Sequence, residues 1–417
     1  MVVGAMMPAD VANSDAALRR SVAVPRGFGE PLAWFLSFDW LLLFGARLGA
    51  LLGRLLGRPI RLGKTVLVAR HADCVEMLGR DLDYLIGPVN GPSVHQINGP
   101  FVLSIDRGAL LDTERRALYA AFKAVDLGAL DAAASAHADA LLDAAGEGLI
   151  DAVGGYARLV AGGTAHRLFG IAPPDEGLFL DVTRSIFHHC FVNPAVNRRI
   201  EARAVNAGRL MHSWFVDEIT RRRDTGALGC DYMGGLLRDA TIDDDAVRRL
   251  LGGMLVGSID PTASALARIA IVMARDPALR AAALPDVRDR TKMLGWCQEA
   301  MRRWPNNPVV LRRAGGDSML GKTHIPAGAN IIGWTQAAMY DAAAFPDPAR
   351  MAAGRPMAAY LHFGGGPHPC GGRLINYWQL PLLAGKLLER GFTRAGRLRW
   401  VGPFPDHLPI RLGGARP

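Results

Sequence analysis

Apolar residues recur at helical spacing from Leu250 to Met273, which makes this the longest regular pattern in the chain. Thr241 and three aspartates precede the run, and the pair Asp276-Pro277 follows it. A threonine with acids after it is typical of a helix start, whereas Asp-Pro is typical of a stop. The pattern therefore predicts one helix of about thirty residues, which is long enough to cross a whole domain.

Other stretches predict shorter elements around this helix. Residues 374–388 are rich in apolar side chains and predict a second core helix, and residues 65–69 followed by 71–78 predict a strand and then a helix. No repeat, low-complexity tract or linker divides the chain, so we expect a single domain over residues 25–417. Residues 1–24 lack strong periodicity and are expected to form a flexible tail.

Composition narrows the class of protein. The 417 residues are 50% apolar and carry 48 basic against 39 acidic side chains, a net charge of +9. Nucleic-acid binding would require that charge in a patch with a known module, and the sequence shows neither. Five scattered cysteines indicate a reducing compartment without a disulfide framework, hence a cytoplasmic protein.

The segment 31–61 raises the question of a membrane. Asp39, Arg47 and Arg54 interrupt it, so no run of eighteen uncharged residues remains and no bilayer span is predicted. Arginines fall on one helical face and large apolar residues on another: Arg47, Arg54, Arg58 and Arg61 against Leu41, Phe44, Leu48, Leu52 and Leu55. We favour an ordinary helix docked on a core by its apolar stripe. Peripheral contact with anionic lipid is the alternative.

The ten residues 363–372, F-G-G-G-P-H-P-C-G-G, predict a socket for one sulfur atom at Cys370. The glycines at 364–366 can bend peptide N–H groups toward one point, and the helix predicted after Cys370 starts beside it. Both effects would stabilise a thiolate, the form that ligates iron. A small buried hydrophobe is the ordinary alternative for a lone cysteine. A zinc site is disfavoured because no C-x-x-C or H-x-x-x-H pair occurs in the sequence.

This loop resembles the haem-binding loop of the cytochrome P450 family. The family pattern F-G-x-G-x-H-x-C-x-G is matched at every fixed position: Phe363, Gly364, Gly366, His368, Cys370 and Gly372. The resemblance implies a mainly α-helical fold with a small β-rich lobe. It also implies haem b as cofactor, with Cys370 as the axial thiolate ligand of its iron.

A second part of the family pattern lies outside the loop. Glu299 and Arg302 are one helical turn apart in W-C-Q-E-A-M-R-R-W-P, and Arg355 stands eight residues before Phe363. An E-x-x-R pair alone is usually a solvated salt bridge. In the family it is buried and completed by an arginine at the place of Arg355, so the resemblance gives these three residues a folding role.

The resemblance also implies donors for the two haem propionates. His368 is expected to hold one, and Arg312 is the expected second contact, with Arg313 as the alternative. Arg115 occupies a further arginine place on an early helix, where Leu111 stands at the usual histidine place and Arg116 is a candidate replacement. A basic helix face without a cofactor role is the alternative for Arg115.

The predicted long helix contains G-M-L-V-G-S-I-D-P-T-A-S, which resembles the family's oxygen-activation segment. Asp260 fits the acid of that segment, but Pro261 stands where an alcohol, usually threonine, belongs. Proline has no N–H, so the carbonyl of Gly257 loses its helical partner and the helix must kink. Thr262 is the nearest substitute hydroxyl, although one residue turns it by about 100° around the axis. Alternatively, Pro261 only shapes the helix, while Asp260, Ser258 or Thr262 delivers protons with water.

Taken together, the resemblance implies a haem-thiolate monooxygenase that oxidises an apolar small molecule with electrons from a separate ferredoxin or flavodoxin-type donor. Pro261 favours one rival within the same class, an enzyme that uses a peroxide or rearranges a hydroperoxide, because branches of the family that do so often lack the threonine. A haem sensor or carrier without turnover is a further alternative from a different class.

Overall fold

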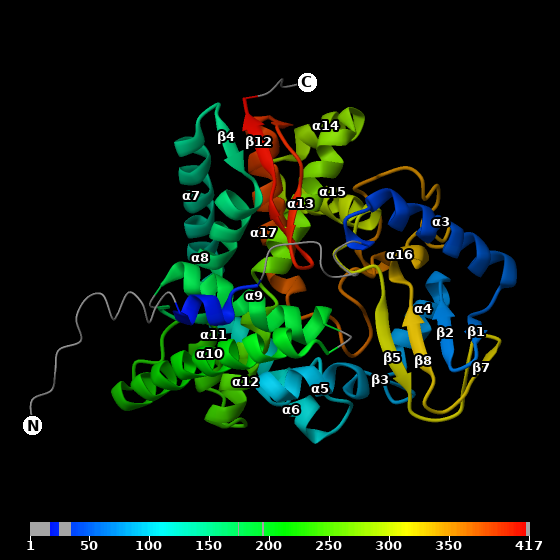
Figure 1. Cartoon of the computed structure of the whole chain (residues 1–417), viewed down its shortest axis with the longest axis horizontal. Coiled ribbons are helices and arrows are strands. Elements are labelled where there is room, and N and C mark those ends of the chain that lie inside the picture. The colour runs from blue at the N-terminus through cyan, green and yellow to red at the C-terminus, as the bar shows by residue number, and fades with distance from the viewer. Residues whose placement is uncertain (1–16, 25–34, 174, 194–195, 414–417) are drawn as a thin grey trace, which may run out of the picture.

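The computed structural model describes residues 17–24, 35–173, 175–193 and 196–413. Helices make up most of it, and the strands gather mainly in a lobe at one side, formed by β1, β2, β8, β5 and β3 beside helices α3, α4 and α16 (Figure 1). The prediction of a mainly α fold with a small β-rich lobe is confirmed.

The elements run in chain order as follows. The α-helices are α3 (Asp39–Leu56), α4 (His71–Gly79), α5 (Gly87–Asn98), α6 (Ala109–Ala121), α7 (Leu127–Ala145), α8 (Arg158–Phe169), α9 (Glu176–Val192), α10 (Arg198–Thr225), α11 (Tyr232–Leu237), α12 (Asp244–Val256), α13 (Asp260–Arg275), α14 (Pro277–Ala283), α15 (Arg290–Arg303), α16 (Thr335–Ala338) and α17 (Arg373–Arg390). The strands are β1 (Ile60–Leu62), β2 (Thr65–Val68), β3 (Tyr84–Leu85), β4 (Leu149–Asp151), β5 (Val310–Ala314), β6 (Ser318–Leu320), β7 (Thr323–Ile325), β8 (Asn330–Gly333), β9 (Phe392–Arg394), β10 (Arg399–Val401), β11 (Phe404–His407) and β12 (Pro409–Leu412).

The largest sheet has the order β1-β2-β8-β5-β3. Its one parallel pair joins β2 to β8, with Thr65 opposite Asn330, and the other pairs are antiparallel. In β2 the side chains of Val66 and Val68 are buried while their neighbours are half-buried, the alternation expected of a strand with one face on the core. The predicted strand and following helix at residues 65–78 are thus present as β2 and α4.

The predicted long helix is present but broken. It consists of α12 and α13 with a break at residues 257–259, and it begins at the cap Asp243, whose side chain accepts from the N–H of Ala246. Thr241 was therefore the wrong cap, because its hydroxyl donates to Asp239 instead. In length and composition this helical stretch is one that could cross a bilayer, yet 89% of its apolar window is buried inside the protein. Its hydrophobicity is that of a core helix.

Two predictions near the amino terminus need correction. Residues 17–22 are helical and Val22 is fully buried in the core, so the predicted flexible tail of residues 1–24 is too long at its carboxyl end; residues 1–16 lie outside the described residues. Helix α3 does not dock by its large apolar stripe. Its buried residues are small, Ala46, Gly49, Ala50 and Gly53 with Leu42, and most of the predicted stripe faces outward.

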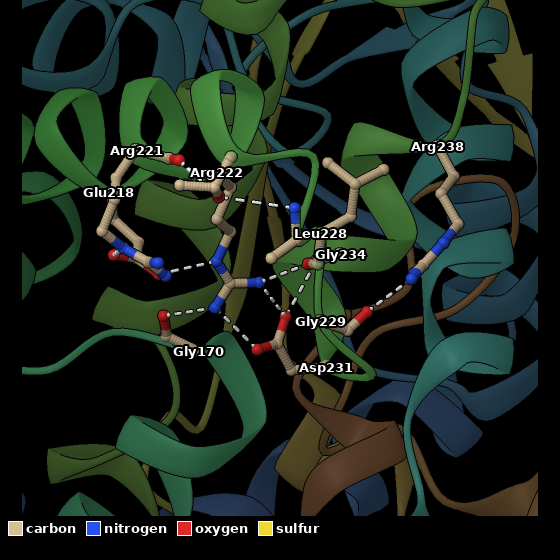
Figure 2. A network of polar contacts seen from close by, with 11 residues as sticks. Gly170, Glu218, Arg221, Arg222, Leu228, Gly229, Asp231, Gly234 and Arg238 are labelled. Carbon is tan, nitrogen blue, oxygen red and sulfur yellow. Dashed lines mark hydrogen bonds and ion pairs between the residues drawn. The ribbon is translucent and has the colours of Figure 1, made fainter.

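A buried arginine fixes the turn between α10 and α11. The Arg222 guanidinium lies 2.7 Å from Oδ1 of Asp231 and also donates to the carbonyls of Gly170 and Leu228, while Glu218 accepts from its Nε (Figure 2). This network joins the ends of α8 and α10 to the start of α11. The network therefore fixes α10 and α11, which both contact α12, relative to each other.

Candidate functional site

Cys370 lies in the turn that leads into α17, as predicted. The N–H of Cys370 donates to the carbonyl of Phe363 over 2.9 Å, which closes the loop on itself. Gly364 and Gly366 have φ angles of 67° and 62°, in the left-handed region that favours glycine. A Cβ at Gly366 would lie 2.0 Å from the carbonyl oxygen of Leu78, so any side chain there would displace the loop.

The surroundings of the Cys370 sulfur differ in detail from the prediction. The backbone N–H groups that face Sγ belong to Gly372 and Arg373, at the start of α17, rather than to the glycines ahead of the cysteine. Burial raises the pKa of the Cys370 thiol, and these two N–H groups oppose that rise. In the protein alone the thiol is therefore not poised as a thiolate, and a bound metal ion would be needed to favour the deprotonated form.

Cys370 lies close to the break between α12 and α13. A Cβ at Gly372 would lie 3.5 Å from Sγ of Cys370 and 3.7 Å from the carbonyl oxygen of Gly257. Because Pro261 has no N–H, that carbonyl cannot accept the usual bond from four residues on. The break predicted from Pro261 is present, with Pro261 in the first turn of α13. An unpaired carbonyl, a helix break and the cysteine thus share one small region.

Three cationic or titratable side chains gather beside the cysteine loop. Arg115 on α6 donates to the carbonyl of Pro367 over 2.8 Å, next to His368, and both Arg115 and Arg312 act electrostatically on the His368 ring. Arg312 is buried, and its guanidinium has no carboxylate partner among the described residues, so burial lowers its pKa to about 10. Arg313 instead is bonded to the carbonyl of Gly328 at the exposed side of the strand. Of the two predicted alternatives, Arg312 is the one that faces His368.

The His368 ring is buried and only partly satisfied. Its Nδ1 lies 3.3 Å from the carbonyl oxygen of Val102, which leaves Nε2 without a hydrogen-bond partner, 3.5 Å from Oδ2 of Asp81. Burial lowers the pKa of His368, and the Asp81 carboxylate is already held by Arg107 through two hydrogen bonds. An added anion at Nε2 would favour the protonated ring.

The replacement suggested for the missing early histidine is not supported. Leu111 is buried, whereas Arg116 is exposed and interacts with Asp239 instead. Arg115 is therefore the α6 residue that reaches the site.

Glu299, Arg302 and Arg355 come together in the core, as predicted. The Glu299 carboxylate is fully buried, 2.8 Å from Nη2 of Arg302 and 3.5 Å from Nε of Arg355. Sequence reasoning missed Tyr360, whose hydroxyl donates to Oε1 of Glu299 over 2.7 Å. Tyr360 stands five residues after Arg355, and this spacing is too common in sequences to indicate that the tyrosine joins the cluster.

This charge cluster also fixes the chain that precedes the cysteine loop. Arg302 donates to the carbonyls of Met339, Pro348 and Arg350, and Arg355 donates to those of Pro346, Asp347 and Arg350; the N–H of Ala352 donates to Glu299. The arginines therefore satisfy backbone groups of a long irregular segment that has few bonds of its own. The cluster thus ties α15 to the segment that precedes the cysteine loop.

Asp260 does not stand free beside the break. Its carboxylate lies 2.6 Å from Nη2 of Arg184 and 3.3 Å from Nε of Arg158, and all three side chains are largely buried. Arg184 in turn lies 2.6 Å from Asp406, which is 23% exposed. The predicted acid is thus the inner end of a charge network that reaches the surface. Nothing in the sequence around Asp260 indicated its partners.

Thr262 does not replace the missing alcohol. Its hydroxyl lies 2.7 Å from the carbonyl oxygen of Ser258 and 2.7 Å from Oδ1 of Asn376 on α17, and the side chain is fully buried. The shift of one residue has turned it toward α17, as the helix geometry predicted. The Thr262 hydroxyl is therefore engaged, whereas the arginines bind Oδ1 of Asp260 and leave its Oδ2 without a hydrogen-bond partner.

These residues fit haem b. A cysteine sulfur would ligate the iron, and the Arg312 guanidinium and Nε2 of His368, with Arg115 beside them, would donate hydrogen bonds to the two propionates. Among the described residues no group of three or more histidine, cysteine or acidic side chains could hold a metal ion alone.

Comparisons with known proteins point the same way. The cytochrome P450 family model matches residues 196–392. The mycinamicin VIII C21 methyl hydroxylase of Micromonospora griseorubida is 27% identical over 195 residues, 46% of this chain and 48% of that protein. The cyclooctat-9-en-7-ol 5-monooxygenase of Streptomyces melanosporofaciens is 26% identical over 205 residues, 42% of this chain and 45% of that protein. The match thus spans about half the length of these relatives.

Solved structures extend the likeness of the fold to nearly the whole chain. CYP108D1 from Novosphingobium aromaticivorans superposes with a TM-score of 0.71 at 21% identity, covering 95% of this chain and 98% of that one. CalO2 superposes with a TM-score of 0.77 at 18% identity, covering 89% and 98%. With the family model and the cysteine site in agreement, residues 196–392 match the cytochrome P450 family, nearly the whole chain has the fold of the cytochrome P450 structures, and the cofactor that this likeness implies is haem b.

Proposed function

We propose that this protein is a haem-thiolate monooxygenase that inserts oxygen into an apolar organic molecule. The observation that carries the proposal is the juxtaposition of Cys370 with the α12–α13 break and with the three propionate donors. Bound haem with a thiolate ligand supplies the oxidising chemistry, since the ligand favours cleavage of an oxygen–oxygen bond. The protein binds and orients the cofactor and the substrate.

Each group of residues then has a distinct role. Cys370 would ligate the haem iron, while Arg115, Arg312 and His368 would hold the haem by its propionates. The break at Pro261 leaves room and an unpaired carbonyl at Gly257, where a small ligand and ordered water can lie. The cluster around Glu299 keeps the cysteine loop in place.

The substrate is proposed to be apolar. The two relatives named above are described as a methyl hydroxylase and a 5-monooxygenase, and these names apply to those proteins. In this chain, apolar residues of α5, the following loop and α9 form one buried cluster with α12, including Val94, Phe101 and Ile186. We propose that this region selects an apolar secondary metabolite.

Electrons are proposed to come from a separate ferredoxin or flavodoxin-type protein in the cytoplasm. The face outside the cysteine loop has a hollow of about 300 Å³ lined by residues that include Leu78, Gly364, Arg373 and Tyr377. Exposed Arg116 adds positive charge on the adjoining α6. An acidic donor would reach the haem most closely there.

A specific observation favours a second candidate, peroxide-driven oxidation. Pro261 supplies no hydroxyl, Thr262 is bonded to Ser258 and Asn376, and Asp260 is bound by two arginines. Proton delivery is needed when dioxygen and electrons are the oxidant, whereas a peroxide already carries the reduced oxygen–oxygen bond.

The experiment that tests the proposal offers the haem-loaded protein one substrate with two kinds of oxidant. Compounds are first screened for a shift of the Soret band on binding. Product with NAD(P)H, ferredoxin and ferredoxin reductase supports the monooxygenase; product only with hydrogen peroxide or a lipid hydroperoxide supports the second candidate. Absence of product with any oxidant, together with tight binding of carbon monoxide, would overturn both in favour of a sensor or carrier. Cys370→Ser is the control for protein-independent oxidation.

A further inference from the structure

Helix α3 is attached to the rest of the protein by its smallest residues. Ala46, Gly49, Ala50 and Gly53 are buried against α16 and its neighbours, and a Cβ at Gly49 would lie 2.7 Å from the ring of Trp334. Small side chains allow the helix to lie flat on its support. They also leave the large side chains of α3 on the opposite face.

That opposite face is apolar and exposed. Figure 1 shows α3 along the outside of the β-rich lobe, over α16. Trp40 is 64% exposed and Leu55 is 69% exposed, and between them lie further large side chains that are each at least 40% exposed: Phe44, Leu48, Leu51 and Leu52. Leu56 and Leu62 continue the surface, which we call the α3 face. Single exposed leucines are ordinary, but a contiguous row of this size marks an interaction site.

The charged residues of α3 after Asp39, and of the chain that directly follows the helix, are all of one sign up to residue 72. From residue 40 to residue 72 the sequence contains no aspartate or glutamate, while six basic residues occur there: Arg47, Arg54, Arg58, Arg61, Lys64 and Arg70. Asp39, at the start of the helix, is bound to Arg275 at 2.5 Å.

The basic residues lie beside the apolar row rather than within it. Arg47 and Arg54 fall at one edge of the row by helix periodicity, and Arg58, Arg61 and Lys64 are exposed just beyond its end. Arg54 and Arg58 have no carboxylate partner in the part of the chain that the structure describes. An apolar row with cations along its edge is complementary to a surface that is both apolar and anionic.

We propose that the α3 face docks on a bilayer that contains anionic lipid, with α3 parallel to the membrane plane. The apolar row enters the boundary between headgroups and acyl chains, and the arginines at its edge bind lipid phosphates. An apolar protein partner would not require the one-signed charge, and a second copy of this chain would bring its own arginines into repulsion. The inference goes beyond the proposed activity, since it concerns where the enzyme acts and where an apolar substrate enters.

The test measures co-sedimentation of the haem-loaded full chain with vesicles. Vesicles of phosphatidylcholine alone are compared with vesicles of equal parts phosphatidylcholine and phosphatidylglycerol, at low and at raised salt. We expect binding to the anionic vesicles that weakens as salt is raised, because exposed charges are screened. We expect the triple variant Trp40→Ser, Phe44→Ser, Leu55→Ser to bind at least about tenfold more weakly.

Matched controls keep the result interpretable. Leu127→Ser, Leu149→Ser and Val216→Ser remove three exposed apolar side chains from other parts of the surface, and this variant should bind like the original. Arg54→Gln with Arg58→Gln should reduce the salt dependence, whereas Arg167→Gln with Arg199→Gln, also exposed, should leave it unchanged. An unchanged Soret band shows that each variant is folded.

Three outcomes would overturn the proposal. They are absence of vesicle binding, equal weakening by the control variants, and a self-association in sedimentation that the triple variant abolishes while no vesicle binds. The last would assign the α3 face to a second copy of the chain. None of these outcomes depends on catalytic activity, so the proposal stands or falls separately from the proposed function.

Discussion

Replacing Pro261 by threonine restores the two groups that the α12–α13 break lacks, a backbone N–H and a hydroxyl. Pro261 lies in the first turn of α13, where proline costs a helix little, so the free energy of unfolding should change by less than about 1 kcal/mol. A positioned proton relay contributes about 10²–10⁴-fold to a rate. Even a small part of that effect should raise, by severalfold, the fraction of NAD(P)H electrons that appear in product rather than in released hydrogen peroxide.

Two further variants separate the hydroxyl from the backbone. Pro261→Ala restores the N–H without a hydroxyl and should leave this coupling near its original value. Thr262→Val removes the bonds to Ser258 and Asn376 and should cost about 1 kcal/mol in stability without changing the coupling. The assay measures product, NAD(P)H consumed and peroxide released with a substrate found by the Soret shift. Equal coupling in Pro261→Thr and Pro261→Ala would refute the reasoning, as would a loss of coupling in Thr262→Val.

Three more predictions follow from charged side chains. Glu299→Gln should lower the free energy of unfolding by about 3–5 kcal/mol, because it leaves two buried arginines uncompensated. Tyr360→Phe should lower it by about 1.5–3 kcal/mol. Urea unfolding measures both changes, and a larger loss of stability in Tyr360→Phe than in Glu299→Gln would contradict this reasoning. Arg312→Gln should weaken haem retention, measured by pyridine haemochrome after gel filtration, but the haem-free protein should be no less stable, because burial already disfavours the charge of Arg312. Arg313→Gln is the control and should retain haem like the original protein. Equal haem loss in both variants would contradict the assignment of Arg312. Hydrogen bonds from two arginines of its own helix lower the pKa of Glu218 from 4.5 to about 2. The stabilisation by Glu218 is therefore complete above about pH 4.5 and is lost as the pH falls toward 2. The free energy of unfolding of Glu218→Gln should be lower than that of the original protein at neutral pH and equal to it in acid, and a constant difference across that range would exclude this cause.

The sequence predicted those parts of the site that are encoded locally. Cys370, its glycines and the helix behind it lie within a few residues of one another, and the left-handed angles of Gly364 and Gly366 follow from residue type. The break at Pro261 follows equally from chemistry, because proline lacks an N–H at any place in a fold. The pairing of Glu299 with Arg302 needed only helix geometry and the family resemblance.

Features that depend on distant partners were missed. Asp260 looked like a free acid because Arg184, 76 residues before it, meets it only after folding, and Asp406, near the far end of the chain, meets Arg184. Thr262 is held by Asn376, 114 residues away. For α3, periodicity located both faces but not which one is buried. The face of α3 that carries small residues is the buried one, because only small residues can approach Trp334 and α16 closely.

The central claim is that Cys370 binds haem iron as a thiolate, and the spectrum of the reduced protein under carbon monoxide tests it most directly. We predict an absorption maximum near the wavelength, in nanometres, that gives the family its name, and its disappearance in Cys370→Ala. A maximum at shorter wavelength in the purified, haem-loaded protein, or an unaltered spectrum in the variant, would contradict the account.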